Sequence, residues 1–243
     1  MKKVALITGA AKGIGRAIAE KFHLLGYVVY IVDLDDENGQ ELVKKLGNNA
    51  FYLNIDITKV EEVELLFNKL LESENQLDVL VNNAGIIKDN VIWNMPLEDF
   101  STVIDVNLKG TWLMCKKGAE VFKKQKNGRI VNIASRAWLG NPGQSNYSAS
   151  KAGVVGLTRV LALELGRYGV LVNAVAPGLI DTPLTQKLSD EVREKLIHAQ
   201  PTKSMGKPED VANTVAFLCD EQTQFITGQT IYVDGGKSIG AGI

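Results

Sequence analysis

The chain alternates between short apolar runs and longer amphipathic segments, and this rhythm restricts the fold more than any other feature. Seven runs are apolar at most positions: residues 4–7, 27–32, 50–54, 77–81, 129–134, 170–176 and 230–233. Such runs are typical of parallel strands buried on both faces. The intervening segments carry apolar residues at helical spacing, as at Ile14, Ile18 and Phe22. Repeated βαβ units predict an α/β, Rossmann-type, doubly wound sheet of seven parallel strands with helices on both faces.

Composition excludes several classes of protein. Of 243 residues, 45% are hydrophobic, and 27 basic against 28 acidic residues give a net charge of −1. Disordered chains lack this apolar content. A near-neutral chain also has no electrostatic reason to bind nucleic acid or an anionic membrane. No linker-like tract divides the sequence, so we expect one cofactor-binding and catalytic domain over residues 1–243, with a substrate-binding excursion around residues 179–208.

The cellular setting follows from the cysteines and the first residues. Cys115 and Cys219 lie far apart without a Cys/His cluster, and the apolar run after Met1 is too short for a secretion signal. We therefore expect a cytoplasmic protein. His23 and His198 have no metal-ligating neighbour at a useful spacing, so no metal site is expected.

A glycine-rich turn follows the first predicted strand. Residues 8–15 read Thr-Gly-Ala-Ala-Lys-Gly-Ile-Gly and open a helix. Glycines at such a turn let the backbone approach a pyrophosphate, which the helix N-terminus then attracts. The spacing differs from the usual dinucleotide fingerprint, and a turn of this kind can also be purely structural.

The end of the second predicted strand bears on the choice of cofactor. Asp33 lies 18 residues after Gly15, near the offset expected for an acid that binds ribose hydroxyls. A carboxylate there repels a 2′-phosphate and favours NAD(H), although it could also be a solvated strand-end residue. Lys12 could hold a 2′-phosphate, so NADP(H) remains possible.

Other polar or glycine-rich clusters also lie at predicted strand ends. They occupy residues 56–57, 82–85, 134–135 and 176–178. Ligands of open α/β sheets bind at the carboxyl edge of the strands, so this distribution predicts a site there.

Tyr147 and Lys151 are the candidate catalytic pair, because residues four apart share a helix face. A free phenol has a pKa of about 10, which a nearby ammonium lowers. Such a tyrosine can exchange a proton with a substrate oxygen, although an ordinary surface pair is the alternative. Ser135, 12 residues earlier, offers a hydroxyl for the same oxygen. Asn107 precedes a predicted helix over residues 108–122 and could fix a water or the lysine, or simply cap that helix.

In combination these motifs resemble the short-chain dehydrogenase/reductase family. The turn at 8–15, the Asn-Asn-Ala-Gly at 82–85, Asn107, Ser135, Tyr147-x-x-x-Lys151 and Pro177-Gly178 follow the family order over nearly the whole chain. One departure is that Ser135 and Tyr147 are one position closer together than is usual.

The resemblance implies a role for each matching residue. Tyr147 would be the general acid/base, Ser135 would hold the substrate oxygen, and Asn107 would hold a water of a proton relay. Lys151 would bind the nicotinamide ribose and depress the pKa of Tyr147. Cofactor contacts would come from Gly9, Lys12, Gly13, Ile14, Gly15, Asp33, Leu34, Asp56, Ile57, Asn83, Ala84, Gly85, Tyr147, Lys151, Pro177, Gly178, Ile180 and Thr182.

The resemblance also suggests a substrate. Residues 141–144 and 175–182 look most like 3-oxoacyl-thioester reductases, which implies a 3-oxoacyl or 3-hydroxyacyl group on acyl carrier protein or coenzyme A. Those reductases commonly prefer NADPH, whereas Asp33 indicates NAD(H). A small alcohol, sugar or steroid substrate is the alternative, and a dinucleotide-binding redox sensor is the non-enzymatic one.

The resemblance further implies a homotetramer or homodimer. The basic run Lys123, Lys124, Lys126 and Arg129 is either a solvated helix end or a patch for an acidic acyl carrier or a coenzyme A phosphate.

Overall fold

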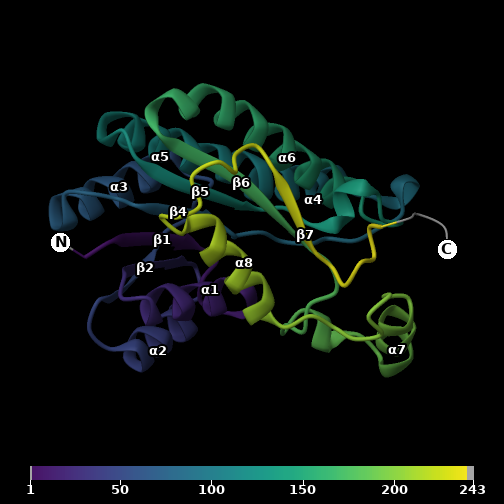
Figure 1. The fold of residues 1–243 in the computed structure, drawn as a ribbon. Helices are drawn as coiled ribbons and strands as arrows, with labels where there is room; N and C mark the ends of the chain where they lie inside the picture. Colours follow the sequence, from purple (N-terminus) through teal and green to yellow (C-terminus); the bar gives the residue numbers. More distant parts are fainter. Residues whose placement is uncertain (1, 240–243) are drawn as a thin grey trace.

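In the computed structural model, which describes residues 2–239, seven strands form one parallel sheet (Figure 1). The strand order is β3-β2-β1-β4-β5-β6-β7. The strands are β1 Val4–Thr8, β2 Val28–Asp33, β3 Ala50–Asn54, β4 Val79–Asn82, β5 Gly128–Ile133, β6 Val170–Pro177 and β7 Thr230–Val233. The predicted fold class and all seven strand positions are confirmed. The order reverses direction at β1 and β4, which is where ligands of such sheets bind.

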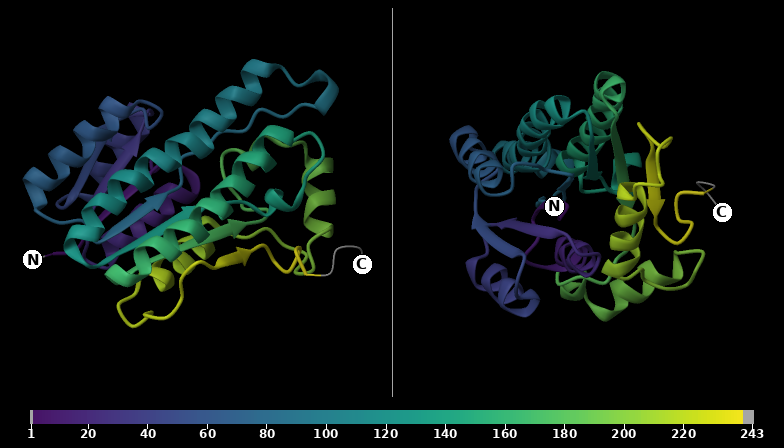
Figure 2. Two further views of the ribbon diagram at one scale, coloured as in Figure 1. Left: turned by 90° about the horizontal axis from the view of Figure 1, so that it is seen from above. Right: turned by 60° about the vertical axis from the view of Figure 1, so that its left-hand side comes forward.

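Helices cover both faces of the sheet (Figures 1 and 2). One layer contains α1 (Gly13–Leu24), α2 (Asp36–Leu46) and α8 (Pro208–Cys219). The other contains α3 (Val60–Glu74), α4 (Leu97–Ile104), α5 (Thr111–Gln125) and α6 (Ser145–Leu165). None of the helices in the described part of the chain is long and apolar enough to cross a membrane.

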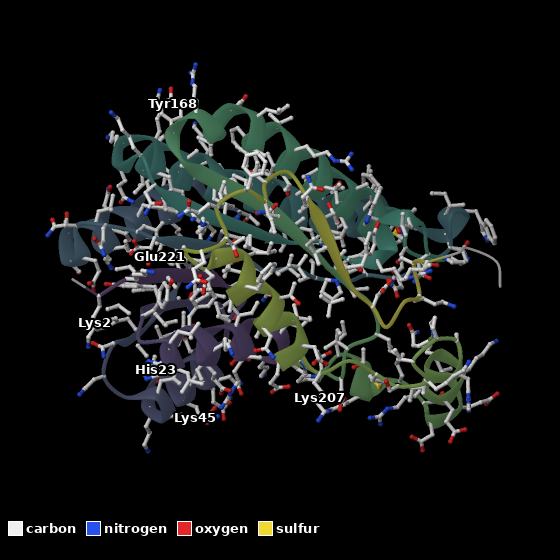
Figure 3. All side chains as sticks on the ribbon, in the orientation of Figure 1. Lys2, His23, Lys45, Tyr168, Lys207 and Glu221 are labelled. Atoms are coloured by element: carbon white, nitrogen blue, oxygen red, sulfur yellow. The ribbon has the colours of Figure 1, made fainter. Side chains whose placement is uncertain are left out.

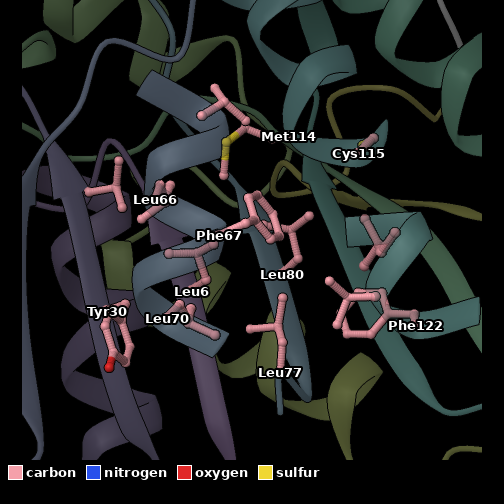
Figure 4. Packing of buried hydrophobic residues seen from close by; sticks show 14 of the residues in the cluster. Leu6, Tyr30, Leu66, Phe67, Leu70, Leu77, Leu80, Met114, Cys115 and Phe122 are labelled. Carbon is pink, nitrogen blue, oxygen red and sulfur yellow. The ribbon is translucent and has the colours of Figure 1, made fainter. Parts of the chain in front are cut away.

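The strands are apolar throughout because alternate residues serve different layers. Leu6 of β1 is fully buried against α3, together with Leu66 and Leu70 (Figure 4). Its neighbours Ala5 and Ile7 face the opposite way, into the cluster that contains Ile18 of α1. Each strand therefore needs apolar side chains on both faces, and burial of this area is the main stabilising contribution to the sheet.

The segment after β6 leaves the sheet. It contains the 3-10 turn Thr185–Lys187 and the short helix α7 (Asp190–His198), which lies beyond the carboxyl ends of the strands (Figure 1). None of the described residues of α7 is buried. This excursion is thus held by few apolar contacts, and it lies at the edge of the sheet where a site is expected.

The predicted start of the helix after Asn107 is wrong. Helix α4 runs without a break through a π-helical segment, Asp105–Gly110, into α5. Asn107 lies inside this π-helical segment and is buried, so it does not cap a helix. A π turn widens the helix by one residue per turn and is found most often at functional sites.

Candidate active site

The glycine turn between β1 and α1 has the backbone that the sequence implied. Gly9 and Gly13 have positive φ angles of 62° and 55°. A Cβ on Gly15 would overlap the carbonyl oxygen of Gly9. Side chains are thereby excluded from the turn, and the free N–H groups of α1 stay accessible, which fits the pyrophosphate of a dinucleotide.

The turn is braced by the end of β4. The Thr8 hydroxyl accepts hydrogen bonds from the backbone N–H groups of Asn83 (3.0 Å) and Ala84 (3.1 Å). The Asn83 side chain donates to the carbonyl oxygen of Gly9 at 2.8 Å. Asn83, expected to contact the cofactor, therefore uses its amide nitrogen to fix the turn. The sequence carried no signal for this contact, because it joins residues 74 positions apart.

Asp33 lies beside the turn at the end of β2. One of its carboxylate oxygens accepts from the backbone N–H of Ala11 at 2.9 Å, and the other accepts from Leu34 at 2.8 Å. Lys12 does not contact this carboxylate and instead forms an ion pair with Asp35 at 2.6 Å. Hydrogen bonds from Asn38 and this lysine lower the pKa of Asp35 to about 2. The structure thus places Asp33, Leu34 and Lys12 beside the glycine turn. The ion pair of Lys12 with Asp35 was missed by sequence reasoning.

The end of β3 contributes two further residues, Asp56 and Ile57, to the same edge. Ile57 is buried, and Asp56 accepts from the Thr58 hydroxyl at 2.7 Å. Burial raises the pKa of Asp56, but the hydrogen bonds from Thr58 outweigh it and leave that pKa lowered. Both residues lie after β3, next to the π-helical segment, since a Cβ on Gly110 would contact the Ile57 side chain.

The segment after β6 returns to the glycine turn. The Thr182 methyl lies 3.6 Å from the position of a Cβ on Gly13. Gly178 donates to Val233 at 2.9 Å, and Ile180 is buried in the core. Thr182 and the turn are therefore neighbours, whereas the Ile180 side chain packs inside the protein.

Ser135 and Tyr147 meet where β5 ends and α6 begins. The Ser135 oxygen accepts from the backbone N–H of Ala137 at 3.1 Å. Burial raises the pKa of Tyr147, and a hydrogen bond with Ser135 opposes that rise. The phenol therefore holds its proton at neutral pH, which suits an acid that donates to a carbonyl oxygen.

Lys151 lies one helical turn beyond Tyr147, with 4% of its surface exposed. Its amine donates to the carbonyl oxygen of Ile133 at 2.8 Å and lies 5.7 Å from the centroid of the Tyr147 ring. Burial lowers the pKa of Lys151 to about 8. The expectation that Lys151 depresses the pKa of Tyr147 is not met in this structure: the pKa is raised, and Ser135 is the group that opposes the rise. The amine is directed at the β5 backbone rather than at the phenol oxygen.

Asn107 projects from the π-helical segment into this group. Its side chain accepts from the Ile86 N–H at 2.8 Å and donates to the Ile86 carbonyl at 3.0 Å and to the Ser150 hydroxyl at 3.2 Å. A Cβ on Gly85 would lie 3.2 Å from the Asn107 oxygen and 3.4 Å from the Lys151 amine. Gly85 therefore lies close to both the Asn107 side chain and the Lys151 amine. Ser150, which hydrogen-bonds to Asn107, is a further residue of this site that sequence reasoning missed.

Replacing Lys151 with methionine is expected to stabilise the unliganded protein at pH 7. Between pH 8 and 10.5 the unfolded chain binds more protons at this site than the folded chain, so the free energy of unfolding rises with pH across that window. The substitution removes a cost on the order of 3 kcal/mol at pH 7, and the gain disappears near pH 10.5. Urea unfolding of both proteins at pH 7 and pH 10 measures the difference in their free energies of unfolding. An equal gain in stability at the two pH values would contradict the explanation by the buried amine.

Comparison with known protein families identifies the family of this chain. The family model described as enoyl-(acyl carrier protein) reductase, a short-chain dehydrogenase/reductase model, matches residues 9–238. The chain belongs to the short-chain dehydrogenase/reductase family. It is therefore an NAD(P)-dependent oxidoreductase.

Relatives and a solved structure agree with this membership. The chain is 44% identical to (2S)-[(R)-hydroxy(phenyl)methyl]succinyl-CoA dehydrogenase subunit BbsD of Thauera aromatica, over 99% of this chain and 98% of the relative. It is 42% identical to the 3-oxoacyl-[acyl-carrier-protein] reductase FabG of Staphylococcus epidermidis, over 97% and 99%. The structure of ElxO with NADP bound superposes with a TM-score of 0.93 at 36% identity, covering 98% of this chain and 99% of that one.

Among the described residues, no group of three or more His, Cys, Asp or Glu side chains could hold a metal ion. His23, which the sequence left without a ligand partner, lies on α1 at the end of the molecule away from α7 (Figure 3).

Proposed function

We propose that this oxidoreductase interconverts a 3-oxoacyl and a 3-hydroxyacyl thioester of coenzyme A, using NAD(H), within a single domain. The observation that carries the proposal is the meeting of Ser135 and Tyr147 beside the buried amine of Lys151. The names of the relatives support the thioester, since FabG is a 3-oxoacyl reductase and BbsD a hydroxyacyl-CoA dehydrogenase. Cytoplasmic localisation fits such a substrate and belongs to the proposal.

Each side chain has a defined task in this proposal. The phenol of Tyr147 gives its proton to the substrate carbonyl oxygen, and the Ser135 hydroxyl hydrogen-bonds to the same oxygen. The bound nicotinamide supplies the hydride, or accepts it in the reverse direction. Lys151 lies beside Gly85 and would reach the cofactor ribose, and Asn107, which hydrogen-bonds to the Ile86 backbone, would hold a water of a proton relay.

Coenzyme A is proposed as the carrier because BbsD, the more similar of the two relatives, is named for a coenzyme A thioester, while the basic run lies too far from the site to position either carrier. The basic run at Lys123 and Lys124 ends α5, whereas the π-helical segment with Asn107 precedes its start. Fifteen helical residues separate the two by about 20 Å. The run thus lies at the edge of the sheet opposite the site, where Lys123 is above the Tyr168 ring.

A homotetramer is part of the proposal. Several apolar side chains are exposed on the long helices and near β7, which is unusual for a monomer surface when they form patches. They are Trp112, Val160, Leu163, Phe217 and Phe225. Pairing of these faces between subunits would cover them.

NADH is expected to give a kcat/KM at least 10-fold above that of NADPH. The Asp33 carboxylate lies beside the glycine turn, where it would repel a 2′-phosphate, while Lys12 is paired with Asp35. The ElxO structure holds NADP, so the two dinucleotides must be compared directly. Asp33→Ser should lower kcat/KM for NADH by about 10-fold or more, since a hydrogen bond to a charged group contributes about 1.5–3 kcal/mol. A preference of the wild type for NADPH would contradict this assignment.

The substrate class is tested by absorbance at 340 nm. Acetoacetyl-CoA, acetoacetyl-acyl carrier protein, free ketones, sugars and steroids are offered with NADH. Turnover confined to the CoA thioester is expected. Turnover of free ketones alone would favour the small-alcohol alternative. Binding of NADH without turnover of any compound would favour a redox sensor.

A further inference from the structure

Arg136 directly follows Ser135 and opens the 3-10 turn Arg136–Leu139. Across residues 2–239, its guanidinium makes no ion pair and no hydrogen bond, and its Nε atom is buried without a partner. Arg16, by contrast, pairs with Glu20 and Glu41. A buried Nε atom without an acceptor is unfavourable for the folded protein alone, and the partly exposed side chain leaves the rest of the guanidinium group open to a partner from outside the chain.

The carboxylates on the neighbouring segment are already engaged. Asp89 accepts two hydrogen bonds from the Gln144 side chain, at 3.1 and 3.0 Å. Asp99 forms an ion pair with Lys88 at 2.7 Å. Neither carboxylate pairs with Arg136, whose Cα atom lies about 3.8 Å from that of Ser135, the preceding residue of the chain.

An apolar hollow lies further along the same connection between β5 and α6. It has a volume of about 380 Å³ and is bounded by residues 90–93 and 140–143 together with Ser145 and Ser148. The hydroxyls of Ser145 and Ser148 are buried without hydrogen-bond partners in the described structure, as is the indole N–H of Trp138. Unsatisfied donors thus concentrate between Ser135 and the start of α6, beside walls made by Ile92 and Trp93.

We infer that Arg136 binds a free carboxylate of the acyl group, so that the preferred substrate is a 3-oxoacyl or 3-hydroxyacyl thioester that carries a second, unesterified carboxylate. The planar guanidinium group suits a carboxylate because it can form two parallel hydrogen bonds. The apolar hollow would hold an uncharged substituent of the same acyl group. The inference rests on the proposed function, since it concerns the same thioester.

The name of one relative is consistent with this chemistry. BbsD is a subunit of a dehydrogenase of a hydroxy(phenyl)methyl-substituted succinyl-CoA, in which a succinyl unit bound through one carboxyl group keeps the other free. Its phenyl group is an uncharged substituent of the kind that the hollow would accommodate.

The test compares 2-benzoylsuccinyl-CoA with its methyl ester, which differs in the charge of one group and in one methyl. With NADH and wild-type protein, kcat/KM for the acid is expected to exceed that for the ester by about 30-fold, the effect of one charged hydrogen-bonded contact. Arg136→Gln should bring the ratio close to one, chiefly through KM, and Arg136→Lys should restore part of it. Arg159→Gln, on the exposed face of α6, controls for the loss of a positive charge and should keep the wild-type ratio.

The outcomes separate the inference from the proposed function. Equal kcat/KM of the wild type for acid and ester, with acetoacetyl-CoA reduced, overturns the role of Arg136 and leaves the thioester activity standing. A fall of kcat/KM by the same factor for acid and ester in Arg136→Gln also overturns the role of Arg136, because an equal fall indicates a structural effect. Failure of the wild type to reduce any of the three thioesters overturns the proposed function. If Arg136→Gln does not fold, the wild-type ratio and Arg136→Lys decide.

Discussion

Replacing Tyr147 with phenylalanine is expected to lower kcat by about 1,000-fold, the usual contribution of a positioned acid or base. The phenol is the group that faces Ser135, and burial keeps it protonated. Phenylalanine preserves the ring and its packing but removes the only proton that this position can deliver. The cofactor-binding turn lies on β1 and α1 and does not depend on this hydroxyl, so NADH affinity should change little.

Steady-state absorbance with acetoacetyl-CoA measures the rate, and quenching of protein fluorescence measures NADH affinity. Tyr168→Phe is the matched control, because Tyr168 lies after α6 at the far end of the molecule (Figure 3). It should keep wild-type kinetics. A Tyr147→Phe protein that retains a tenth or more of the wild-type rate would refute the assignment of the acid.

Gly15→Ala is expected to abolish tight cofactor binding and to destabilise the fold. The added methyl would overlap the Gly9 carbonyl and lie 2.5 Å from the Asn83 amide, so the turn and its bracing contact must move. Overpacking of this kind costs about 3 kcal/mol at the upper end. A displaced turn also loses alignment of several N–H groups at once, so we expect NADH affinity to fall at least 100-fold, or about 2.7 kcal/mol.

Gly156→Ala is the control for this substitution. Gly156 lies within α6, and no heavy atom of the described structure lies within 4 Å of a Cβ added there. Alanine in a helix is favoured over glycine by about 1 kcal/mol, so this variant should be slightly more stable and fully active. Thermal unfolding and NADH titration compare the two, and a Gly15→Ala protein with wild-type values would contradict the close-approach argument.

The sheet could be predicted because its strands are defined by local composition. The predicted strands at 50–54 and 230–233 match β3 and β7 residue for residue. Buried parallel strands need apolar side chains on both faces, and this requirement is visible in a single sequence. The clusters at strand ends were informative for a similar reason, since parallel strands carry their carboxyl ends to one edge.

Features that depend on contacts between distant segments could not be predicted. The spacing of Tyr147 and Lys151 correctly indicated a shared helix face, but the direction of both pKa shifts depends on burial, and the Lys151 amine has its hydrogen-bond acceptor on β5, at the Ile133 carbonyl. Lys12 was weighed against Asp33 without its partner Asp35, which lies 23 positions away. The π-helical segment was missed because its apolar spacing differs from that of an α-helix by a single residue.

The π-helical segment restricts how the length of the chain can change in evolution. Each residue advances an α-helix by about 100°, so loss of one residue between α4 and α5 would rotate the whole of one element relative to the other. Asn107 would then leave Ile86 and Ser150, and the buried stripe of α5 would leave the sheet. Insertions and deletions should therefore be tolerated in the exposed excursion at α7, and new substrate ranges should arise there by changes of length, while the Asp105–Gly110 segment diversifies only by substitution.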